Sequence, residues 1–461
     1  MTLSQRCRFE VFVWPTMKAV LTLIFMVVMF PGCQQQPMKP VQPAQDAGSR
    51  DLSIVISGDT RGWLMPCGCT SNQSGGLLRR ATYFEQIRDK SDVVVLDCGG
   101  AADGTAPYQQ ARFKAILMGE KLMKLAVHNI GVSEAAFGAE ILKQLSAETG
   151  IEFISANIRQ NDTSFTATHK LVLQSGHRLL ITGVCSQKLI AEAENIPAGI
   201  GVSDPADAIL SVIEEVRQPD AIVLVLAWLP EDEMRQLAES LPEIHILVGG
   251  PTGQSVPPQI VGRTLIMSAT NKGKFIAHIP MPQNHEPLVT AEIVELSPSF
   301  ADNADQKLNL ESFRSMLAAR DFTAAESGFI PTSIAIGAAE QLIAGTDSCR
   351  ECHTNSCSVW DKSGHSHAWA RLESEKGQVD PYCQQCHTTG YGLPSGFISL
   401  KESGARTNVG CESCHGPSTQ HVRENRTSTP FDAKGSCTHC HDHENSPHFS
   451  FTEYWEKILH E

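Results

Sequence analysis

Short apolar runs alternate with amphipathic stretches over the first two thirds of the chain. Leu52–Ser57 is a run of β-prone residues, Leu77–Arg88 has helical spacing, and residues 93–97 form a second β run that ends in an acidic residue. Further apolar runs follow at 151–156, 179–184, 221–227 and 244–248. Strands that alternate with helices are typical of a layered α/β domain whose functional loops follow the carboxyl ends of the strands.

The pattern is different near the start of the chain. Met17-Lys18 precedes an apolar run at 19–30, which is followed by Pro31-Gly32-Cys33. This order indicates a secretory signal of the lipoprotein type over residues 1–33, with Cys33 as the lipidated residue. The run is shorter than the roughly 20 residues that span a bilayer. An uncleaved anchor is the alternative, and Met17 is an alternative start.

Residues 34–50 are polar and rich in proline, and we expect them to form a flexible tether. Gln34, directly after the lipidated cysteine, favours sorting to the outer membrane. We therefore expect the protein on the periplasmic side of the cell envelope, held to a membrane by its lipid.

Residues 296–344 are rich in Ala and Ser and predict a helical connector. Its apolar side chains recur at helical spacing, which favours one core-facing stripe. They are Leu308, Leu310, Phe313, Met316 and Leu317.

Length and charge narrow the choice of protein class. A chain of 461 residues is long enough for two or three domains. A formal net charge of −14 argues against a nucleic-acid-binding protein, because neutralising phosphates requires clustered Lys and Arg.

The pattern C-x-x-C-H occurs four times in the last quarter of the chain. The copies are Cys349-Arg-Glu-Cys352-His353, Cys383-Gln-Gln-Cys386-His387, Cys411-Glu-Ser-Cys414-His415 and Cys437-Thr-His-Cys440-His441. Such a motif attaches a c-type haem, because two thiols bond to the porphyrin and the adjoining His binds the iron. A pair of zinc ribbons is the alternative, but it does not explain the His after every second Cys.

Histidine usage also favours haem. Eleven of the seventeen His lie at or beyond His353, and four of these belong to the motifs. The other seven are His365, His367, His421, His439, His443, His448 and His460. As distal iron ligands we predict His365 or His367, together with His421, His448 and His460. His439 and His443 flank the fourth motif too closely to reach its iron.

The segment 345–461 resembles the tetrahaem cytochrome c-554 family. Besides the haem motifs, the resemblance rests on Trp360-x-x-Ser363-Gly364-His365-Ser366-His367-Ala368, Cys386-His387-Thr388-Thr389-Gly390-Tyr391-Gly392 and Gly416-Pro417 followed by His421. It implies a mostly helical domain with four c-type haems, in which most irons have two His ligands and one can have an open sixth site. About thirty residues per haem are too few for a conventional core, so we expect the porphyrins to form it.

The segment 51–295 resembles calcineurin-like metallophosphoesterases of the 5'-nucleotidase branch. The matching pieces are Ser57-Gly58-Asp59-Thr60-Arg61-Gly62, Cys67-Gly68-Cys69, Leu96-Asp97-Cys98-Gly99-Gly100, Gly131-Val132-Ser133-Glu134 and Val248-Gly249-Gly250. The resemblance implies an α/β layered sandwich that holds two metal ions at the ends of its strands.

Most of that family's metal ligands are missing. Asp59 remains, but other residues stand where the resemblance expects Asp, Asn or His; they are Arg61, Gly100, Val132, Ser133, Trp228 and Pro251. Arg61 places a fixed cation where a metal would bind. We therefore predict a pseudoenzyme that lacks the metal pair needed for hydrolysis. The alternative is a phosphoesterase with ligands relocated to Asp97, Glu134 and the cysteines.

Four cysteines of this segment lie outside the haem motifs. The fold that the resemblance implies brings Cys67, Cys69 and Cys98 together, and in an oxidising compartment we predict a disulfide from Cys98 to Cys67 or Cys69. A zinc or copper thiolate site is the alternative. Cys185 lies on an apolar strand, so we predict that its thiol is buried in the core. For Cys357, in the haem segment, we predict either a buried thiol or a link to another chain.

The predicted fold class is therefore an α/β metallophosphoesterase-like layered sandwich followed by a mostly α multihaem cytochrome c domain. The predicted function is extracytoplasmic electron transfer through four c-type haems, with redox proteins as partners and the first domain used for docking or scaffolding. One rival is a multihaem redox enzyme acting on a small nitrogen or sulfur species. The other is a working nucleotidase.

Overall fold

The computed structural model describes residues 50–66, 73–282, 291–329, 342–424, 429 and 432–460. The predicted signal with Cys33, nearly all of the predicted tether, and Cys67 and Cys69 lie outside the described residues. Within them, no helix combines the length and the apolar character needed to cross a membrane.

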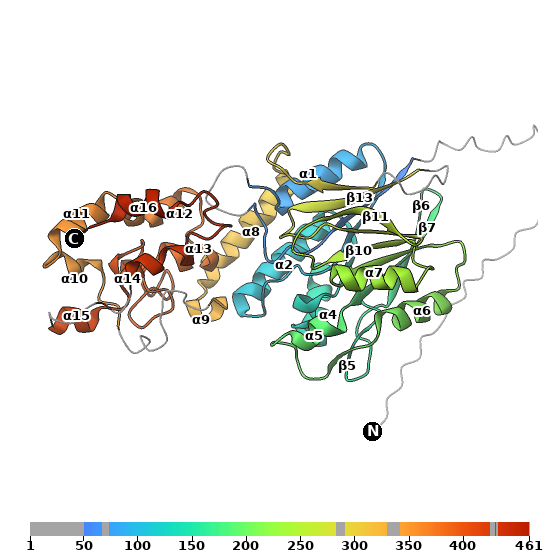
Figure 1. Cartoon of the computed structure of the whole chain (residues 1–461), viewed down its shortest axis with the longest axis horizontal. Helices are drawn as coiled ribbons and strands as arrows, with labels where there is room; N and C mark the ends of the chain where they lie inside the picture. Colours follow the sequence, from blue (N-terminus) through green and yellow to red (C-terminus); the bar gives the residue numbers. More distant parts are fainter. Residues whose placement is uncertain are drawn as a thin grey trace, which may run out of the picture. The chain divides into compact units, whose positions relative to one another are not determined.

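The first domain contains two six-stranded sheets (Figure 1). One has the order β14-β13-β1-β2-β3-β4. Its parallel strands are β1 (Leu52–Ser57), β2 (Asp92–Asp97), β3 (Leu125–Asn129) and β4 (Phe153–Ile154). β13 (Phe275–Met281) runs antiparallel to β1 and to the edge strand β14 (Glu292–Glu295).

The second sheet has the order β11-β12-β10-β9-β7-β6. Its parallel strands are β7 (His177–Cys185), β9 (Ile222–Trp228), β10 (Ile246–Gly250) and β12 (Thr264–Ser268), with antiparallel β6 (His169–Gln174) and β11 (Val256–Val261) at the edges. β5 (Ile158–Gln160) and β8 (Ile200–Val202) form a separate pair. Each apolar run predicted as a strand contains one, although the run at 151–156 forms only the two-residue β4.

Apolar side chains fill the space between the two sheets. Ile54, Ile56 and Leu96 of the first sheet and Leu224 and Leu226 of the second are fully buried in one cluster. A second cluster lies under α1 (Leu77–Arg88), α2 (Pro107–Leu122) and α4 (Gly138–Thr149), and a third lies under α6 (Pro205–Val216) and α7 (Glu231–Ser240). Two short helices, α3 (Val132–Ala135) and α5 (Gln187–Glu192), complete this part. The layers are helix, sheet, sheet, helix, which confirms the predicted α/β sandwich.

The predicted connector packs as part of the first domain. It contains α8 (Ala304–Arg320) and α9 (Ala324–Ser327). Phe313 and Leu317 join the cluster beneath α1 and α2, and the Gln306 amide donates a 2.8 Å hydrogen bond to the Gly119 carbonyl of α2. The predicted apolar stripe is wrong at Leu308, which is 61% exposed because it lies on the outer face of α8.

The segment from residue 345 onward is made of short helices and turns. They are α10 (Thr346–Arg350), α11 (Thr354–Asp361), η1 (Gly364–His367), α12 (Ala368–Ser374), α13 (Pro381–His387), η2 (Gly404–Arg406), α14 (Cys411–His415), α15 (Thr419–Glu424), η3 (Ala433–Gly435), η4 (Cys437–His439) and α16 (Phe451–Ile458). Among its described residues, the buried hydrophobic ones are Cys357, Ala368, Leu372, Tyr391, Leu393 and Phe397. So few apolar side chains cannot form a core alone, which supports the expectation that the porphyrins supply it.

Two leucines on α8 test how the connector is held. Leu317 is fully buried against the first domain, so Leu317→Ala should lower the free energy of unfolding by about 2–5 kcal/mol. Leu308→Ala removes the same atoms from an exposed position of the same helix and should change it by less than about 0.5 kcal/mol. The measurement is denaturant unfolding followed by circular dichroism. Equal losses for the two variants would mean that α8 does not pack as described.

Candidate functional site

Each C-x-x-C-H motif forms a tight helical turn. In the first and fourth motifs, the backbone N–H of His353 and of His441 donates a 2.9 Å hydrogen bond to the carbonyl of the motif's first Cys. α13 carries the second motif, and its Asp380 side chain caps the helix by accepting from the Tyr382 N–H at 2.9 Å. α14 is the third motif itself. Because residues three apart lie on one face of a helical turn, both thiols of a motif can reach one porphyrin edge.

Three pairs of imidazoles face each other across gaps of similar size. The ring centroids are 6.0 Å apart for His353 and His421, 5.9 Å for His415 and His460, and 6.2 Å for His365 and His441. Two imidazoles on opposite sides of one metal ion have centroids roughly 6 Å apart, because each metal–nitrogen bond is about 2 Å long. The centroid spacing of each pair therefore matches that of two imidazoles with one iron between them.

The four motifs lie close together. The thiols of Cys349 and Cys411 hydrogen-bond to each other, which joins the first and third motifs. The thiols of Cys386 and Cys440 do the same for the second and fourth motifs. Cys414 of the third motif also interacts with Cys437 and Cys440 of the fourth, so the attachment points form one connected series.

Burial favours the neutral form of two of the paired imidazoles, those of His415 and His365. Burial, and then the nearby His460, lower the pKa of His415. Burial, and then the nearby His441, lower the pKa of His365. A neutral imidazole keeps the lone pair that a metal needs, so these shifts favour ligation.

The second motif differs from the other three. The Nδ1 of His387 lies 2.9 Å from the Ala368 carbonyl, a contact that fixes the ring and leaves Nε2 for a metal. Among the described residues, no second histidine ring stands opposite His387 at a comparable distance. Of the predicted distal ligands, the structure places His365, His421 and His460 opposite motif histidines. It leaves His367 and His448 exposed and outside these pairs.

Sequence reasoning missed a buried carboxylate inside the third motif. Glu412 accepts hydrogen bonds from the backbone N–H groups of Ala344, Gly345 and Ser418 at 2.8, 2.6 and 2.8 Å. It ties the start of the haem segment to the third motif. The sequence shows a carboxylate between the two cysteines of the motif, but nothing in it indicates that this carboxylate is buried or which groups it contacts.

In the first domain, an indole fills the pocket where the resemblance expects metals. A Cβ on Gly100 would lie 2.0 Å from Cη2 of Trp228, and a Cβ on Gly131 would lie 2.9 Å from Cδ2 of the same ring. Trp228 is 5% exposed and so closes the space between the loops that follow β2 and β3. The Nε of Arg61 lies 2.6 Å from Oδ1 of Asp59, which occupies the one remaining family ligand. This geometry agrees with the predicted loss of the metal pair.

The disulfide predicted for Cys98 is not formed in the structure, which corrects that prediction. Cys98 is a free thiol in the apolar cluster between the sheets, and its Sγ lies 3.2 Å from the Val248 carbonyl. Burial raises the pKa of Cys98 well above its ordinary value, which favours the neutral thiol. A residue directly after a strand can face the core or the loop, and here it faces the core. Cys67 and Cys69 lie outside the described residues, whereas Cys185 and Cys357 are buried thiols.

Comparison with known proteins separates the two parts of the chain. The model of the family "Cytochrome c554 and c-prime" matches residues 348–416. A cytochrome c-554 from Nitrosomonas europaea is 29% identical over 117 residues, which are 22% of this chain and 50% of that protein. The chain therefore spans about half the length of this curated relative. The C-terminal region is thus similar to c-type cytochromes and implies c-type haem.

Solved structures resemble the first domain. A 5'-nucleotidase precursor from Thermus thermophilus has a TM-score of 0.52 at 21% identity, over 59% of this chain and 60% of its own. A sulfate thiohydrolase from the same species, solved with glycerol, has a TM-score of 0.52 at 14% identity, over 59% and 62%. A calcineurin-like phosphoesterase from Bacillus subtilis has a TM-score of 0.50 at 13% identity, over 58% and 97%. Such low identities establish the phosphoesterase-like fold and nothing about activity.

The ring pairs predict which histidines hold the irons. His365→Ala, His421→Ala and His460→Ala should each convert one low-spin haem to a high-spin one, because each removes one of two axial nitrogens. Electron paramagnetic resonance of the haem-loaded protein measures this change. His367→Ala is the matched control, since it removes an imidazole two residues from His365 that faces no motif histidine. A new high-spin signal in His367→Ala but not in His365→Ala would contradict the pairing.

Proposed function

We propose that this chain is an extracytoplasmic multihaem c-type cytochrome that carries electrons through four covalently bound haems. The observation that supports it best is the set of three imidazole pairs at 5.9–6.2 Å, which join motif histidines to distal ones. The localisation rests on the signal-like segment that ends at Cys33. The lipid anchor and the outer membrane belong to the same proposal.

The chain's own residues arrange these sites for electron transfer rather than for changes at the metal. Haem iron supplies one-electron redox chemistry when it is bound. The histidine pairs would hold a bound iron through two imidazoles, so its coordination need not change between oxidation states. The thiol contacts of Cys349 with Cys411 and of Cys386 with Cys440 bring neighbouring attachment points together, which favours short electron steps.

The first domain serves as a scaffold for the haem segment in this proposal. Tyr108 of α2 donates a 2.6 Å hydrogen bond to the Asp380 carboxylate, the same group that caps α13. Lys272 and Lys274 form ion pairs of 3.0 and 3.1 Å with Glu444. The contacts come from α2 and from a loop at the mouth of the closed metal pocket, so this mouth supports the chain's own haem segment.

A second candidate function is favoured by one observation. His387 has a motif but no opposing imidazole among the described residues, so a small molecule could occupy the sixth position of its iron. The chain would then be a multihaem redox enzyme acting on a small nitrogen or sulfur species. The nucleotidase alternative has no such support, because Trp228 fills the metal pocket.

Haem counting and carbon monoxide binding test the proposal. We expect four haems per chain by the pyridine haemochrome assay, and four electrons taken up per chain in a reductive titration. Fewer than four haems would overturn the proposal. A spectrum that carbon monoxide leaves unchanged would support the carrier alone. One carbon-monoxide-binding haem per chain would support the enzyme instead.

The scaffold role predicts that the Tyr108 hydroxyl stabilises the contact with Asp380. Burial, with Asp380 adding to it, raises the pKa of Tyr108 well above its ordinary value, so the hydroxyl stays protonated and donates. Tyr108→Phe should destabilise the contact by roughly 1.5–3 kcal/mol, because the bond involves a charged group. Hydrogen exchange at residues 380–387 should become faster.

Tyr83→Phe is the matched control for this variant. The Tyr83 hydroxyl lies 2.9 Å from His278 Nδ1, and both residues belong to the first domain. The control should leave exchange at residues 380–387 unchanged. Equal acceleration in both variants would contradict a specific contact through Tyr108.

A further inference from the structure

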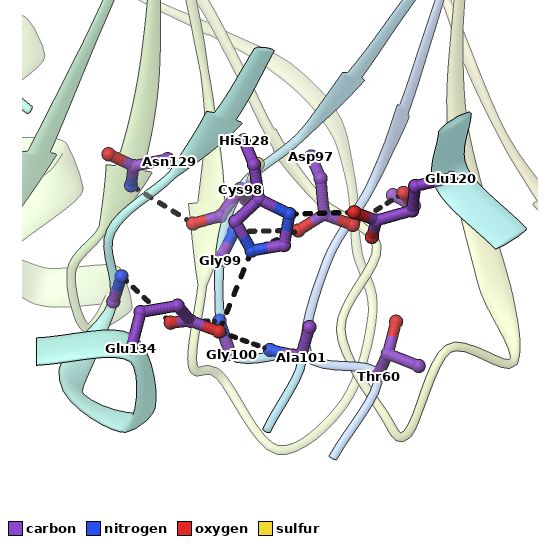
Figure 2. Close-up of polar contacts among 12 residues, drawn as sticks. Thr60, Asp97, Cys98, Gly99, Gly100, Ala101, Glu120, His128, Asn129 and Glu134 are labelled. Atoms are coloured by element: carbon purple, nitrogen blue, oxygen red, sulfur yellow. Dashed lines mark hydrogen bonds and ion pairs between the residues drawn. The ribbon is translucent and has the colours of Figure 1, made fainter. Parts of the chain in front are cut away.

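A group of charged side chains is completely buried beneath the closed metal pocket (Figure 2). Asp97 ends β2, His128 lies on β3, Glu120 lies on α2 and Glu134 lies on α3. All four are 0% exposed. Asp97, Glu120 and His128 offer ligand atoms that lie within 4.8 Å of one another.

One nitrogen in this group has no hydrogen-bond partner. His128 Nδ1 lies 2.9 Å from the Glu120 carboxylate, but its Nε2 makes no hydrogen bond. Nε2 points toward two carboxylate oxygens, Oδ1 of Asp97 at 3.8 Å and Oε1 of Glu134 at 3.6 Å (Figure 2). Both distances are too long for a hydrogen bond. A bare lone pair facing two buried anions would be repelled, so this gap calls for a positive species.

The charges of the group lead to the same conclusion. The three carboxylates are opposed by one buried cation, Arg80, so a neutral His128 leaves two negative charges uncompensated. Uncompensated net charge in a fully buried site is strongly unfavourable. One divalent cation would neutralise the group, whereas a proton on His128 would leave one negative charge uncompensated.

We propose that His128 Nε2, Asp97 Oδ1 and Glu134 Oε1 hold a divalent transition-metal ion such as Zn²⁺ or Mn²⁺. Nε2 lies 3.8 Å from Oδ1 of Asp97 and 3.6 Å from Oε1 of Glu134, so the two carboxylates must move toward the imidazole to bind an ion with bonds of about 2.1 Å. Glu120 accepts from Nδ1–H and so orients the imidazole, the usual arrangement of a metal-bound histidine.

This site differs in place and role from the pair of metals implied by the phosphoesterase resemblance. It uses neither Asp59 nor the position of Trp228, and it has no exposed ligand, so it suits a structural ion rather than a hydrolytic one. Glu134 also accepts from the N–H groups of Gly100, Ala101 and Gly131 at 2.9, 2.7 and 3.0 Å. An ion here would therefore fasten the loops after β2 and β3 that bracket Trp228.

Metal analysis of the haem-loaded full chain tests the proposal. The protein is incubated with Zn²⁺ or with Mn²⁺, freed of loosely bound ions, and analysed by inductively coupled plasma mass spectrometry. Iron is compared with the haem count, so that a non-haem iron is recognised. We expect one non-haem metal ion per chain and a lower melting temperature after treatment with a strong chelator. Less than about a tenth of an ion per chain would overturn the proposal and leave a protonated His128.

Three variants locate the ion. His128→Gln should abolish the extra metal. Glu120→Gln preserves the size of the side chain and should weaken metal affinity about 10–100-fold. If His128→Gln does not fold, Glu120→Gln tests the site in its place. Asp59→Asn, at the old pocket, is the matched control and should retain one ion per chain. Loss of the ion in Asp59→Asn with full retention in Glu120→Gln would place the metal in the old pocket and overturn the proposal.

Discussion

The haem segment depends on imidazoles that meet in pairs about 6 Å apart. Each pair joins residues far apart in the chain, such as His353 with His421 and His365 with His441. In a segment with six buried hydrophobic residues among those described, these pairs are the main long-range constraints on the path of the chain. Ligation by the distal histidine would contribute to the free energy of folding, because that histidine lies far along the chain from the motif that attaches the haem. Three of the four motif histidines have such a partner in the part of the chain that the structure describes.

In the first domain, apolar packing rather than ligand binding stabilises the fold. Its inner core consists of apolar residues from both sheets, so the packing of the sandwich does not rely on the polar residues at the strand ends. The space between the loops after β2 and β3 is filled, because the Trp228 ring lies against Gly100 and Gly131. Filling the volume matters since empty space in a packed interior costs stability. The tryptophan at 228 therefore requires a glycine at 100, because a Cβ there would lie 2.0 Å from the indole.

Local patterns explain what the sequence could predict. The haem motifs, the strand at Leu52–Ser57 and the helix at Leu77–Arg88 were predictable because their signals lie within a few neighbouring residues. The choice between His365 and His367 was not, because tertiary packing decides which of two nearby rings faces His441. Cys98 was predicted wrongly because its orientation depends on the second sheet. The contact of His128 with Glu120 could not be predicted, because the residue spacing of a helix and that of a strand do not indicate which of their side chains meet.

The contacts between the two parts of the chain use the edge where α/β folds usually bind substrates. Trp63, after β1, lies edge to face against Tyr382 at 5.8 Å, and Lys272, after β12, pairs with Glu444. Asp380 both caps the helix of the second motif and accepts from Tyr108. A shift of that contact would move the cap and, through α13, the ring of His387. This edge of the first domain thus contributes to the geometry of the one haem motif that lacks an opposing imidazole among the described residues.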